Sequence, residues 1–232
     1  MRFMVRISFI SIFLLIIKAG SNISHAQSDY EDSLAIRELC SSFGNACGTK
    51  KREADQIKRF SQKVVREKDQ LKLTLESGKQ LVLTDADLRS EHRRVYRFIT
   101  IFPQTGYFLV QINAWEGRAY RMIHGSTGTM IQLDAVPIIS PDMKRLVTTS
   151  LDLEAGYMPN RIQIYRIEAV GIEQEWQKEF AGSGPSDAEW IDRETISYLE
   201  NTSPDGGQTL RKWRRILKQG KDGWEETDIK QK

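Results

Sequence analysis

The stretch Pro137-Ile-Ile-Ser-Pro-Asp-Met-Lys-Arg-Leu-Val-Thr-Thr-Ser150, followed after a polar break by Asn160-Arg-Ile-Gln-Ile-Tyr-Arg-Ile-Glu168, decides the fold class. A Ser-Pro-Asp turn leads into the β-branched run 146–149, and a loop containing Gly and Pro comes next. In the second run the apolar side chains of Ile162 and Ile164 alternate with polar ones. Period-two alternation bounded by turn residues is typical of half-buried antiparallel strands. The stretch therefore predicts two strands of an antiparallel sheet.

Short runs with this alternation of apolar and polar residues recur along most of the chain after residue 70. Short turns with Gly or charged residues separate them, so several pairs are expected to form hairpins. In the run 161–168 the alternation slips by one residue at Arg166-Ile167, which predicts a strand end or a bulge. Turn signals that recur about every 8 to 12 residues are typical of sandwiches, barrels and propellers. They predict a mostly β, antiparallel domain over residues 71–232. The other runs are 71–75 and 80–84, 107–113 and 119–124, 130–133, 172–180, 190–191 and 195–199, and 210–217 and 224–227.

The order of the strands repeats loosely from residue 99 onward. A turn, three or four strands and a polar end recur in three passes, 99–133, 137–180 and 186–230. A period near ~40 residues is that of four-stranded propeller blades, and a closed propeller has at least about four of them. We therefore predict a propeller-like meander, a partial or small propeller, with short N-terminal helices. Two packed antiparallel sheets, a β-sandwich, are the alternative.

Two turns carry a family resemblance. The turn Ser140-Pro-Asp-Met-Lys144 resembles the Ser-Pro-Asp-Gly-Lys turn of TolB-like and WD40-like β-propeller repeats, and the segment 203–210 is similar to the Asp-box of secreted propellers. In that family the Asp and Ser side chains hydrogen-bond to backbone groups, as Asx-turn chemistry predicts. The resemblance implies structural turns and carries no activity. The matching residues are Ser140, Asp142, Ser203, Asp205, Gly207 and Thr209, and the departures are Met143 where Gly is usual and Leu210 where an aromatic residue is usual.

The first 26 residues have the form of a secretory signal peptide. Arg2 and Arg6 are basic, residues 9–17 contain one polar residue, and Ser24-His25-Ala26 is an A-x-A-like cleavage site. The apolar run is short against the ~20 residues of a membrane span, so an uncleaved anchor is the less favoured alternative. We expect a secreted protein of the bacterial periplasm, with no stable membrane insertion after cleavage.

Removal of this segment changes the charge of the chain. The formal net charge is +3, and Arg2, Arg6 and Lys18 lie in the segment without any acidic residue, so residues 27–232 have a net charge of zero. A near-neutral protein gives no support for a nucleic-acid partner. No Gly-rich phosphate loop is present, and no cofactor is expected. The mature chain is long enough for one domain with a hydrophobic core.

Cys40 and Cys47 are the only cysteines, and both lie in the exported part of the chain. Because thiols are oxidised in that compartment, we expect a Cys40–Cys47 disulfide. A loop this short stabilises the fold by about 2 kcal/mol in the chain-entropy picture. A metal site is disfavoured, since no histidine lies near the pair to complete four ligands.

Residues 27–70 are expected to form an N-terminal helical segment that contains the cysteine pair. Within it, 32–39 and 51–71 have helical character, and the second has one apolar face and one face rich in Lys and Arg. We favour a solvated face with i,i+4 ion pairs, because acidic residues are mixed in. A basic helix that binds an anionic surface is the alternative. The apolar face consists of Ile57, Phe60, Val64 and Val65.

Residues for catalysis or metal binding are few. His92 and His124 are the only histidines of the mature chain, and no G-x-S-x-G motif is present, so a serine triad is not expected. We interpret His124 as a surface or strand residue. Asp85 and Asp87 offer hard oxygen ligands to a cation, although a turn with Asp87 near a helix N-cap is favoured. The sequence indicates no catalytic residue.

Two aromatic residues define candidate ligand-binding positions. Trp115 stands beside Glu116 in a predicted turn, where it either anchors a partner or packs onto its own sheet. Arg211 and Trp213 belong to the densest basic cluster of the β half, which is expected to form the wet face of a strand.

The sequence thus favours a secreted, non-enzymatic domain that binds an unknown protein, an envelope polymer or a small ligand. The alternative is a small glycan-directed hydrolase that uses carboxylates. A hydrolase would need two carboxylates to converge, which only the fold decides.

Overall fold

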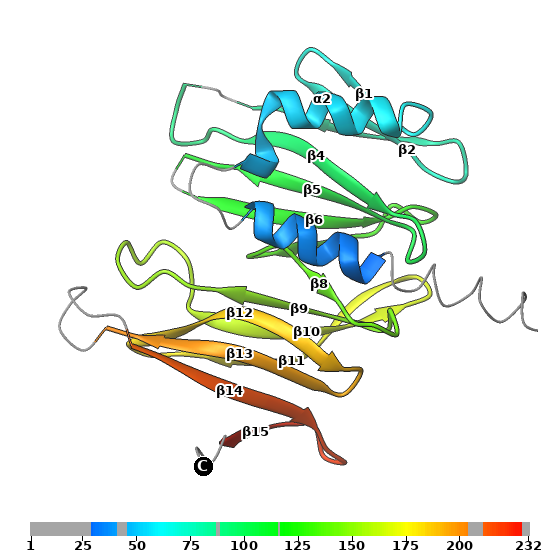
Figure 1. The fold of residues 1–232 in the computed structure, drawn as a ribbon. Helices are drawn as coiled ribbons and strands as arrows, with labels where there is room; N and C mark the ends of the chain where they lie inside the picture. Colours follow the sequence, from blue (N-terminus) through cyan, green and yellow to red (C-terminus); the bar gives the residue numbers. More distant parts are fainter. Residues whose placement is uncertain (1–28, 41–45, 87–88, 116, 204–210, 229–232) are drawn as a thin grey trace, which may run out of the picture.

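A computed structural model describes residues 29–40, 46–86, 89–115, 117–203 and 211–228 (Figure 1). The protein is mostly β, as predicted, with four antiparallel sheets and two helices in this part of the chain. The helices are the segment 29–40 and α2 (Lys50–Arg59), with the 3₁₀ turn η1 (Ala46–Gly48) between them. Each sheet is a meander of strands that are consecutive in the chain.

The bounds of the strands follow from the hydrogen-bonded ladders. The first sheet contains β1 (Val64–Glu67), β2 (Gln70–Thr74) and β3 (Gln80–Thr84). The second contains β4 (Val95–Phe102), β5 (Tyr107–Asn113), β6 (Arg118–His124) and β7 (Met130–Leu133). The third contains β8 (Ile138–Ile139), β9 (Arg145–Ser150), β10 (Arg161–Glu168) and β11 (Gly171–Glu179), and the fourth contains β12 (Ser183–Asp192), β13 (Thr195–Thr202), β14 (Arg211–Gln219) and β15 (Trp224–Asp228).

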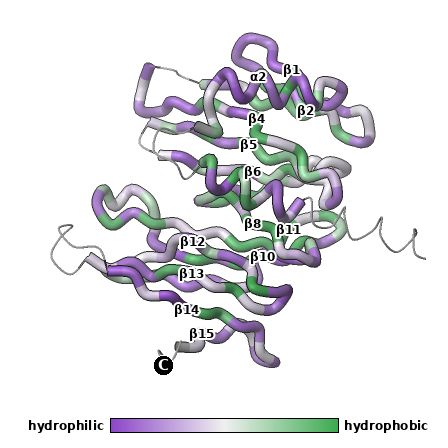
Figure 2. Tube along the Cα trace, viewed as in Figure 1, coloured by the Kyte–Doolittle hydropathy of each residue, from purple (hydrophilic) through white to green (hydrophobic). Residues whose placement is uncertain are grey.

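The four sheets stack face to face in chain order, and one hydrophobic cluster lies between each pair of neighbours (Figures 1 and 2). Leu71 and Leu73 of the first sheet are buried against Phe98 and Val110 of the second. The three four-stranded sheets occupy nearly the same residues as the three predicted passes. Burial between sheets, rather than within any one of them, therefore stabilises the fold.

The stretch 137–168 forms the third sheet, which lies in the interior of the stack. Leu146 packs toward the second sheet, whereas its neighbour Val147 packs toward the fourth. Ile162 and Ile164 are fully buried, as the predicted strands require. The prediction of half-buried strands is wrong for β9 and the first half of β10, because sheets cover both faces of this one.

The stack is open at its ends. The outer face of the first sheet exposes Val65 and Val82 on either side of the half-buried Lys72, and the outer face of the fourth exposes Lys212 and Arg214. Among the described residues no hydrophobic cluster joins the first sheet to the fourth. A partial propeller-like array and a sandwich of sheets both describe this arrangement.

Two local predictions require correction. The helix predicted over 51–71 ends at Arg59, and β1 and β2 follow it, so the β region begins at residue 64 rather than 71. Val64 is buried and Val65 is 39% exposed, because adjacent residues of a strand point to opposite faces. Adjacent β-branched residues favour a strand over a helix. The bulge in the β10–β11 pair lies between Ile164 and Tyr165, not at residues 166–167.

The helix 29–40 forms hydrogen bonds with three of the four sheets and so links them. Its buried face repeats at Asp29, Ser33, Ile36 and Cys40, which is the spacing of one side of a helix. Asp29 Oδ2 accepts hydrogen bonds from the backbone of residues 104 and 105 in the second sheet, both at 3.1 Å. Ser33 Oγ accepts from the amide of residue 139 in the third, and Tyr30 and Arg37 donate to backbone oxygens of the fourth.

The turn that precedes β9 is built from side chain–backbone hydrogen bonds. Asp142 Oδ1 accepts from the Ser140 hydroxyl at 2.7 Å and from the Lys144 amide at 3.2 Å. The Arg145 amide donates to Ser140 Oγ at 3.0 Å. Met143 has φ 58, the left-handed conformation for which the related turns use Gly. In the second predicted turn Ser203 is described, whereas Asp205 and Gly207 lie outside the described residues.

Candidate functional site

A basic hollow lies where three elements meet at one end of the second sheet. The start of α2, the start of β4 and the β5–β6 turn form its walls, and its volume is about 360 Å³. We call it the Trp115 pocket. Among the described lining residues four are cationic and none is acidic. It is lined by Gly48, Lys50, Arg93, Val95, Arg97, Asn113, Ala114, Trp115, Gly117 and Arg118.

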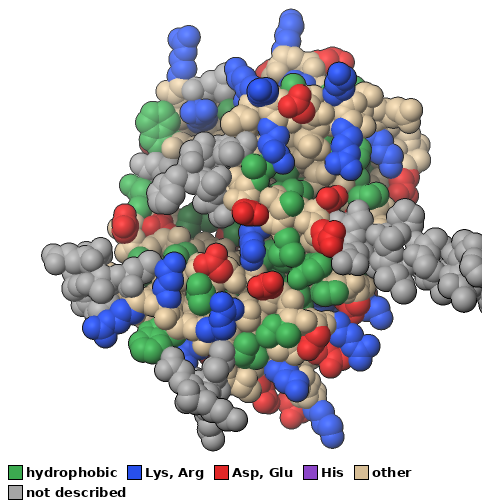
Figure 3. Space-filling view, in the orientation of Figure 1, with side chains coloured by type: hydrophobic (Ala, Val, Ile, Leu, Met, Phe, Trp, Pro, Cys, Tyr) green, Lys and Arg blue, Asp and Glu red, His purple; other side chains and the backbone are tan. Residues whose placement is uncertain are grey.

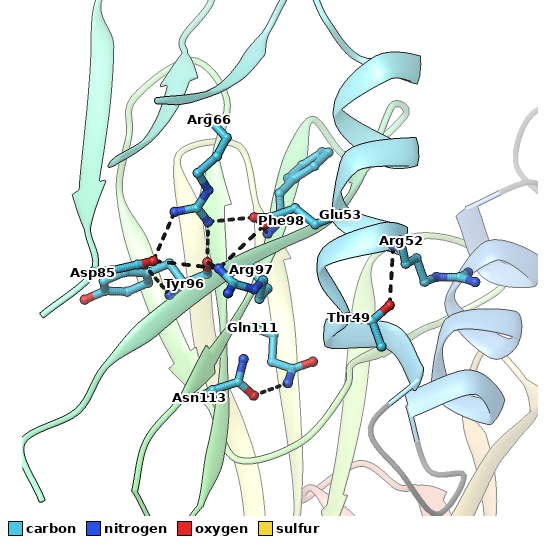
Figure 4. A network of polar contacts seen from close by, with 10 residues as sticks. All are labelled: Thr49, Arg52, Glu53, Arg66, Asp85, Tyr96, Arg97, Phe98, Gln111 and Asn113. Atoms are coloured by element: carbon cyan, nitrogen blue, oxygen red, sulfur yellow. Dashed lines mark hydrogen bonds and ion pairs between the residues drawn. The ribbon is translucent and has the colours of Figure 1, made fainter. Parts of the chain in front are cut away.

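The disulfide holds the start of α2 against the second sheet. Cys40 and Cys47 are bonded, as predicted, and both are buried. The bond links the helix 29–40 to η1, whose last residue is Gly48. A Cβ atom on Gly48 would lie 2.6 Å from Gln111 Nε2, so any other residue here would displace the Gln111 side chain. The same Nε2 donates to Asn113 Oδ1 at 2.5 Å and so supports the floor of the pocket (Figure 4).

The first turn of α2 is capped at its beginning. Thr49 is the N-cap residue, and its Oγ1 accepts a hydrogen bond from the Arg52 amide at 3.3 Å (Figure 4). An N-cap side chain of this kind satisfies one of the free amides of a helix start. Lys50, the first residue of α2, lines the pocket from this position.

A buried network of four charged residues lies beside the pocket, between α2 and the first two sheets (Figure 4). Glu53 Oε1 accepts from Arg66 Nη2 at 2.6 Å and from the Phe98 amide at 3.0 Å. Asp85 Oδ1 accepts from the Tyr96 amide at 2.8 Å, and its Oδ2 lies 3.3 Å from Arg66 Nη1. The network has two positive and two negative charges, so it neutralises itself. The fourth member is Arg97, 3.6 Å from Glu53 and 3.7 Å from Asp85.

The unpaired positive charge therefore belongs to other residues of the pocket. Lys50 and Arg93 are exposed, and neither forms an ion pair with any described residue. The i,i+4 ion pairs expected on the basic helix are absent, since no ion pair joins two of the residues 50–59, all of which are described. The cations of α2 are thus free to meet a ligand.

A longer groove continues from the pocket along α2. Its volume is about 840 Å³, and it shares Lys50, Arg93, Val95 and Arg97 with the Trp115 pocket. We call it the α2 groove. Figure 3 shows Lys and Arg side chains gathered over α2 and the first sheet, around this region. Its other lining residues are Glu53, Ala54, Ile57, Lys58, Ser61, Val64, Val65, Arg66, Lys68, Asp69 and Asp85.

A third hollow, the central cleft, meets the pocket at Gly117 and Arg118. It has a volume of about 490 Å³ and lies between the helix 29–40 and the second, third and fourth sheets. Two of its carboxylates are already engaged, since Asp134 pairs with Arg161, and Asp152 accepts three backbone amides of the following loop. Burial raises the pKa of Tyr120, which also lines it, to about 12.

The structure brings only some of the predicted site residues together. Trp115 is 57% exposed and lines the pocket. Arg211 and Trp213 lie on β14 of the fourth sheet, so they belong to another part of the molecule. Trp213 is 47% exposed. Glu116 lies outside the described residues.

Of the two predicted metal ligands, Asp85 is among the residues that the structure describes and Asp87 is not. Asp85 is engaged by Arg66 and the Tyr96 amide, and Asp87 lies outside the described residues. Within the described part of the chain, no three His, Cys, Asp or Glu side chains form a group that could hold a metal ion. His124 is the last residue of β6, its Nδ1 is 2.9 Å from Ser126 Oγ in the turn that follows, and its ring packs on Tyr107.

Sequence reasoning missed most of the cations of the pocket. Arg93, Arg97 and Arg118 stand in separate segments that meet only in the fold. The one signal for the pocket in the sequence was the high content of Lys and Arg in the segment 50–68. It indicated a charged helix, but it did not show which other segments contribute cations to the same hollow.

No protein-family model matches the chain, and no curated protein matches it. None of the described helices is long and apolar enough to cross a membrane. The propeller-like resemblance of the turns therefore stays a prediction.

Proposed function

We propose that the chain is an exported, non-enzymatic binding domain that holds an anionic ligand in the Trp115 pocket. The observation that supports this function is the lining of the pocket, which combines the exposed cations Lys50 and Arg93 and an exposed indole ring with no described carboxylate. Cations in a concave site attract anions and strengthen the hydrogen bonds made to them. An aromatic ring at such a site supplies apolar contact area to a ligand.

Two features support a location outside the cytoplasm. The first 26 residues have the form of a signal peptide, and the disulfide between Cys40 and Cys47 suits an oxidising compartment. The bacterial periplasm is the proposed compartment, where envelope polymers and small anions are the available ligands.

A carboxylate hydrolase is the alternative from the sequence, and the geometry favours binding over it. Glu53 and Asp85 do converge, but on Arg66 and Arg97, and each also accepts a backbone amide. Carboxylates held in this way link α2 to the first and second sheets. A hydrolase needs one carboxyl group free to protonate a leaving group and another free to attack or to activate water.

The proposal is tested by titrating the purified chain, residues 27–232, with a panel of small and polymeric anions in calorimetry. We expect binding that weakens with salt, because the contacts are electrostatic. The double variant Lys50→Ala/Arg93→Ala should lose at least tenfold in affinity, since each lost ionic contact weakens binding by about 1 kcal/mol or more. Lys212→Ala, an exposed cation on the fourth sheet, is the matched control.

Two results would contradict the proposal. One is a failure of every anion in the panel to bind. The other is turnover of a glycan substrate that disappears in a Glu53→Gln variant with an unchanged fold, which would revive the hydrolase.

A further inference from the structure

We infer that the ligand of this site is an extended acidic polysaccharide, which lies across the Trp115 pocket and continues along the α2 groove. The inference rests on the proposed function and adds the class of the ligand and its course over the surface. It starts from the shared lining of the two hollows, which places them side by side, and together we call them the depression.

The length of the depression requires a ligand longer than a single small anion. The groove follows one side of α2, with Lys50, Ala54, Ile57 and Lys58 on its wall. A helix of 10 residues is about 15 Å long. The Trp115 pocket extends the depression beyond the first residue of the helix. A polymer of several units fills this length, whereas a monomer occupies only one part.

The charges are distributed along the whole length. Lys58 stands at the far end, Lys68, Lys50 and Arg93 lie nearer the first turn of α2, and Arg118 lies beside Trp115. The first four are exposed and form no ion pair with described residues. Glu53 and Asp85 are neutralised by Arg66 and Arg97, so Asp69 is the one remaining carboxylate among the described residues of the depression. The lining therefore matches a repeated negative charge.

The exposed indole decides between classes of polyanion. Trp115 offers a flat apolar face that is 57% exposed beside the cations. The C–H face of a sugar ring packs on such a surface while its carboxylate reaches the cations. Polyphosphate and an acidic peptide satisfy the charges but have no ring for the indole. Single-stranded nucleic acid has rings that stack, but the mature chain is near neutral and is expected outside the cytoplasm.

The experiment measures affinity against the length of one oligomer series. Oligogalacturonates of one, two, four and six units serve as the probe, with neutral oligomers of the same lengths as the comparison. We expect affinity to rise with each added unit up to the length of the depression, by at least tenfold from two units to six. Neutral oligomers should bind at least tenfold more weakly than acidic ones of equal length.

Two variants locate the ligand. Lys58→Ala should weaken the six-unit oligomer several-fold and leave the two-unit oligomer unchanged, because only the long one reaches the last turn of α2. Trp115→Ala should weaken every acidic oligomer about tenfold and leave the binding of polyphosphate unchanged. Lys212→Ala controls for general charge, and thermal unfolding of each variant checks its fold.

The outcomes separate the two proposals. Equal affinity for one unit and six units would overturn the extended ligand and leave the anionic pocket in place. Tighter binding of polyphosphate, polyglutamate or single-stranded DNA than of the six-unit oligomer would overturn the polysaccharide. Failure of all anions would overturn both.

Discussion

Arg66 of β1 and Glu53 of α2 form an ion pair with 2.6 Å between Nη2 and Oε1, and each also contacts the second sheet. Glu53 Oε1 accepts the amide of Phe98, and Arg66 donates to the backbone oxygen of Tyr96. The pair therefore joins the helix to two sheets at once. It holds in place the wall of the α2 groove, while leaving the exposed cations of that wall unpaired.

Replacing Arg66 should destabilise the fold strongly. Arg66→Met removes the guanidinium from a network in which Glu53 and Asp85 are buried, and it leaves two carboxylates to share Arg97. Breaking a buried ion pair on one side costs about 3–5 kcal/mol. Urea unfolding measures the free energy of unfolding, and Lys51→Met, an exposed helix cation, should change it by less than about 0.5 kcal/mol.

The same network predicts a coupling between its members. The double variant Glu53→Gln/Arg66→Met should lose less stability than the two single variants together, since residues in one network do not act additively. Additive losses would show that the two groups do not act as a pair.

The turn before β9 should depend on a single acceptor. Asp142→Ala removes the oxygen that accepts from Ser140 and Lys144, with an expected loss of about 1 kcal/mol. Asp142→Asn retains an oxygen at the same place and should recover most of that loss. Equal losses in the two variants, in chemical unfolding at neutral pH, would contradict the role of this acceptor.

The disulfide should stabilise both the fold and the pocket. We expect Cys40→Ala/Cys47→Ala to lower the free energy of unfolding by about 2 kcal/mol, because the unfolded chain gains freedom. Reducing agent should destabilise the native chain by a similar amount and leave the double variant unaffected. A native chain insensitive to complete reduction would show that the bond contributes nothing.

Gly48 should be required for the approach of η1 to β5. A Cβ atom there would lie 2.6–2.9 Å from three atoms of the buried Gln111 side chain. Overpacking of this kind costs about 1–3 kcal/mol, so Gly48→Ala should unfold at lower denaturant and bind anions more weakly. Gly171→Ala is the control, since nothing lies within 4 Å of the added atom. Equal stability of the two variants would show that Gln111 yields without cost.

Ionisation of the Asp29 carboxyl group should lower the free energy of unfolding as pH rises above about 4. Burial is the main cause that raises its pKa above 3.8, and amides of Thr105 and Gln104 oppose the rise. The folded chain holds this proton more tightly than the unfolded chain, so the contribution of the group to stability is fully present below the unfolded pKa and is lost as pH rises through the folded pKa. Asp29→Asn retains an oxygen for the two amides and does not titrate.

The measurement compares the unfolding free energies of Asp29→Asn and of the native chain across pH. Their difference should move in favour of the variant as pH rises above about 4 and level off once the carboxyl group of Asp29 has ionised in the folded chain. A constant difference for Asp29→Asn would mean that burial does not affect this carboxyl group.

Local patterns predicted most of the strands and their turns. The hairpin of 71–75 with 80–84 forms as β2 and β3, and 107–113 with 119–124 forms as β5 and β6. Alternation and turn chemistry depend on neighbours in the chain, which a sequence displays directly. The helix end was missed because the spacing of Val64 and Val65 fits a helical face as well as a strand.

The sequence by itself determined the β class, the approximate bounds of the strands and the cysteine pair, since alternation, turn residues and the proximity of two thiols are local properties. Only the tertiary structure decided that the sheets form an open stack, that Glu53 and Asp85 neutralise Arg66 and Arg97, and that Arg93, Lys50 and Trp115 share one hollow. Those relationships join residues far apart in the chain. They depend on which faces of the sheets meet to bury apolar surface, and no short stretch of sequence contains that information.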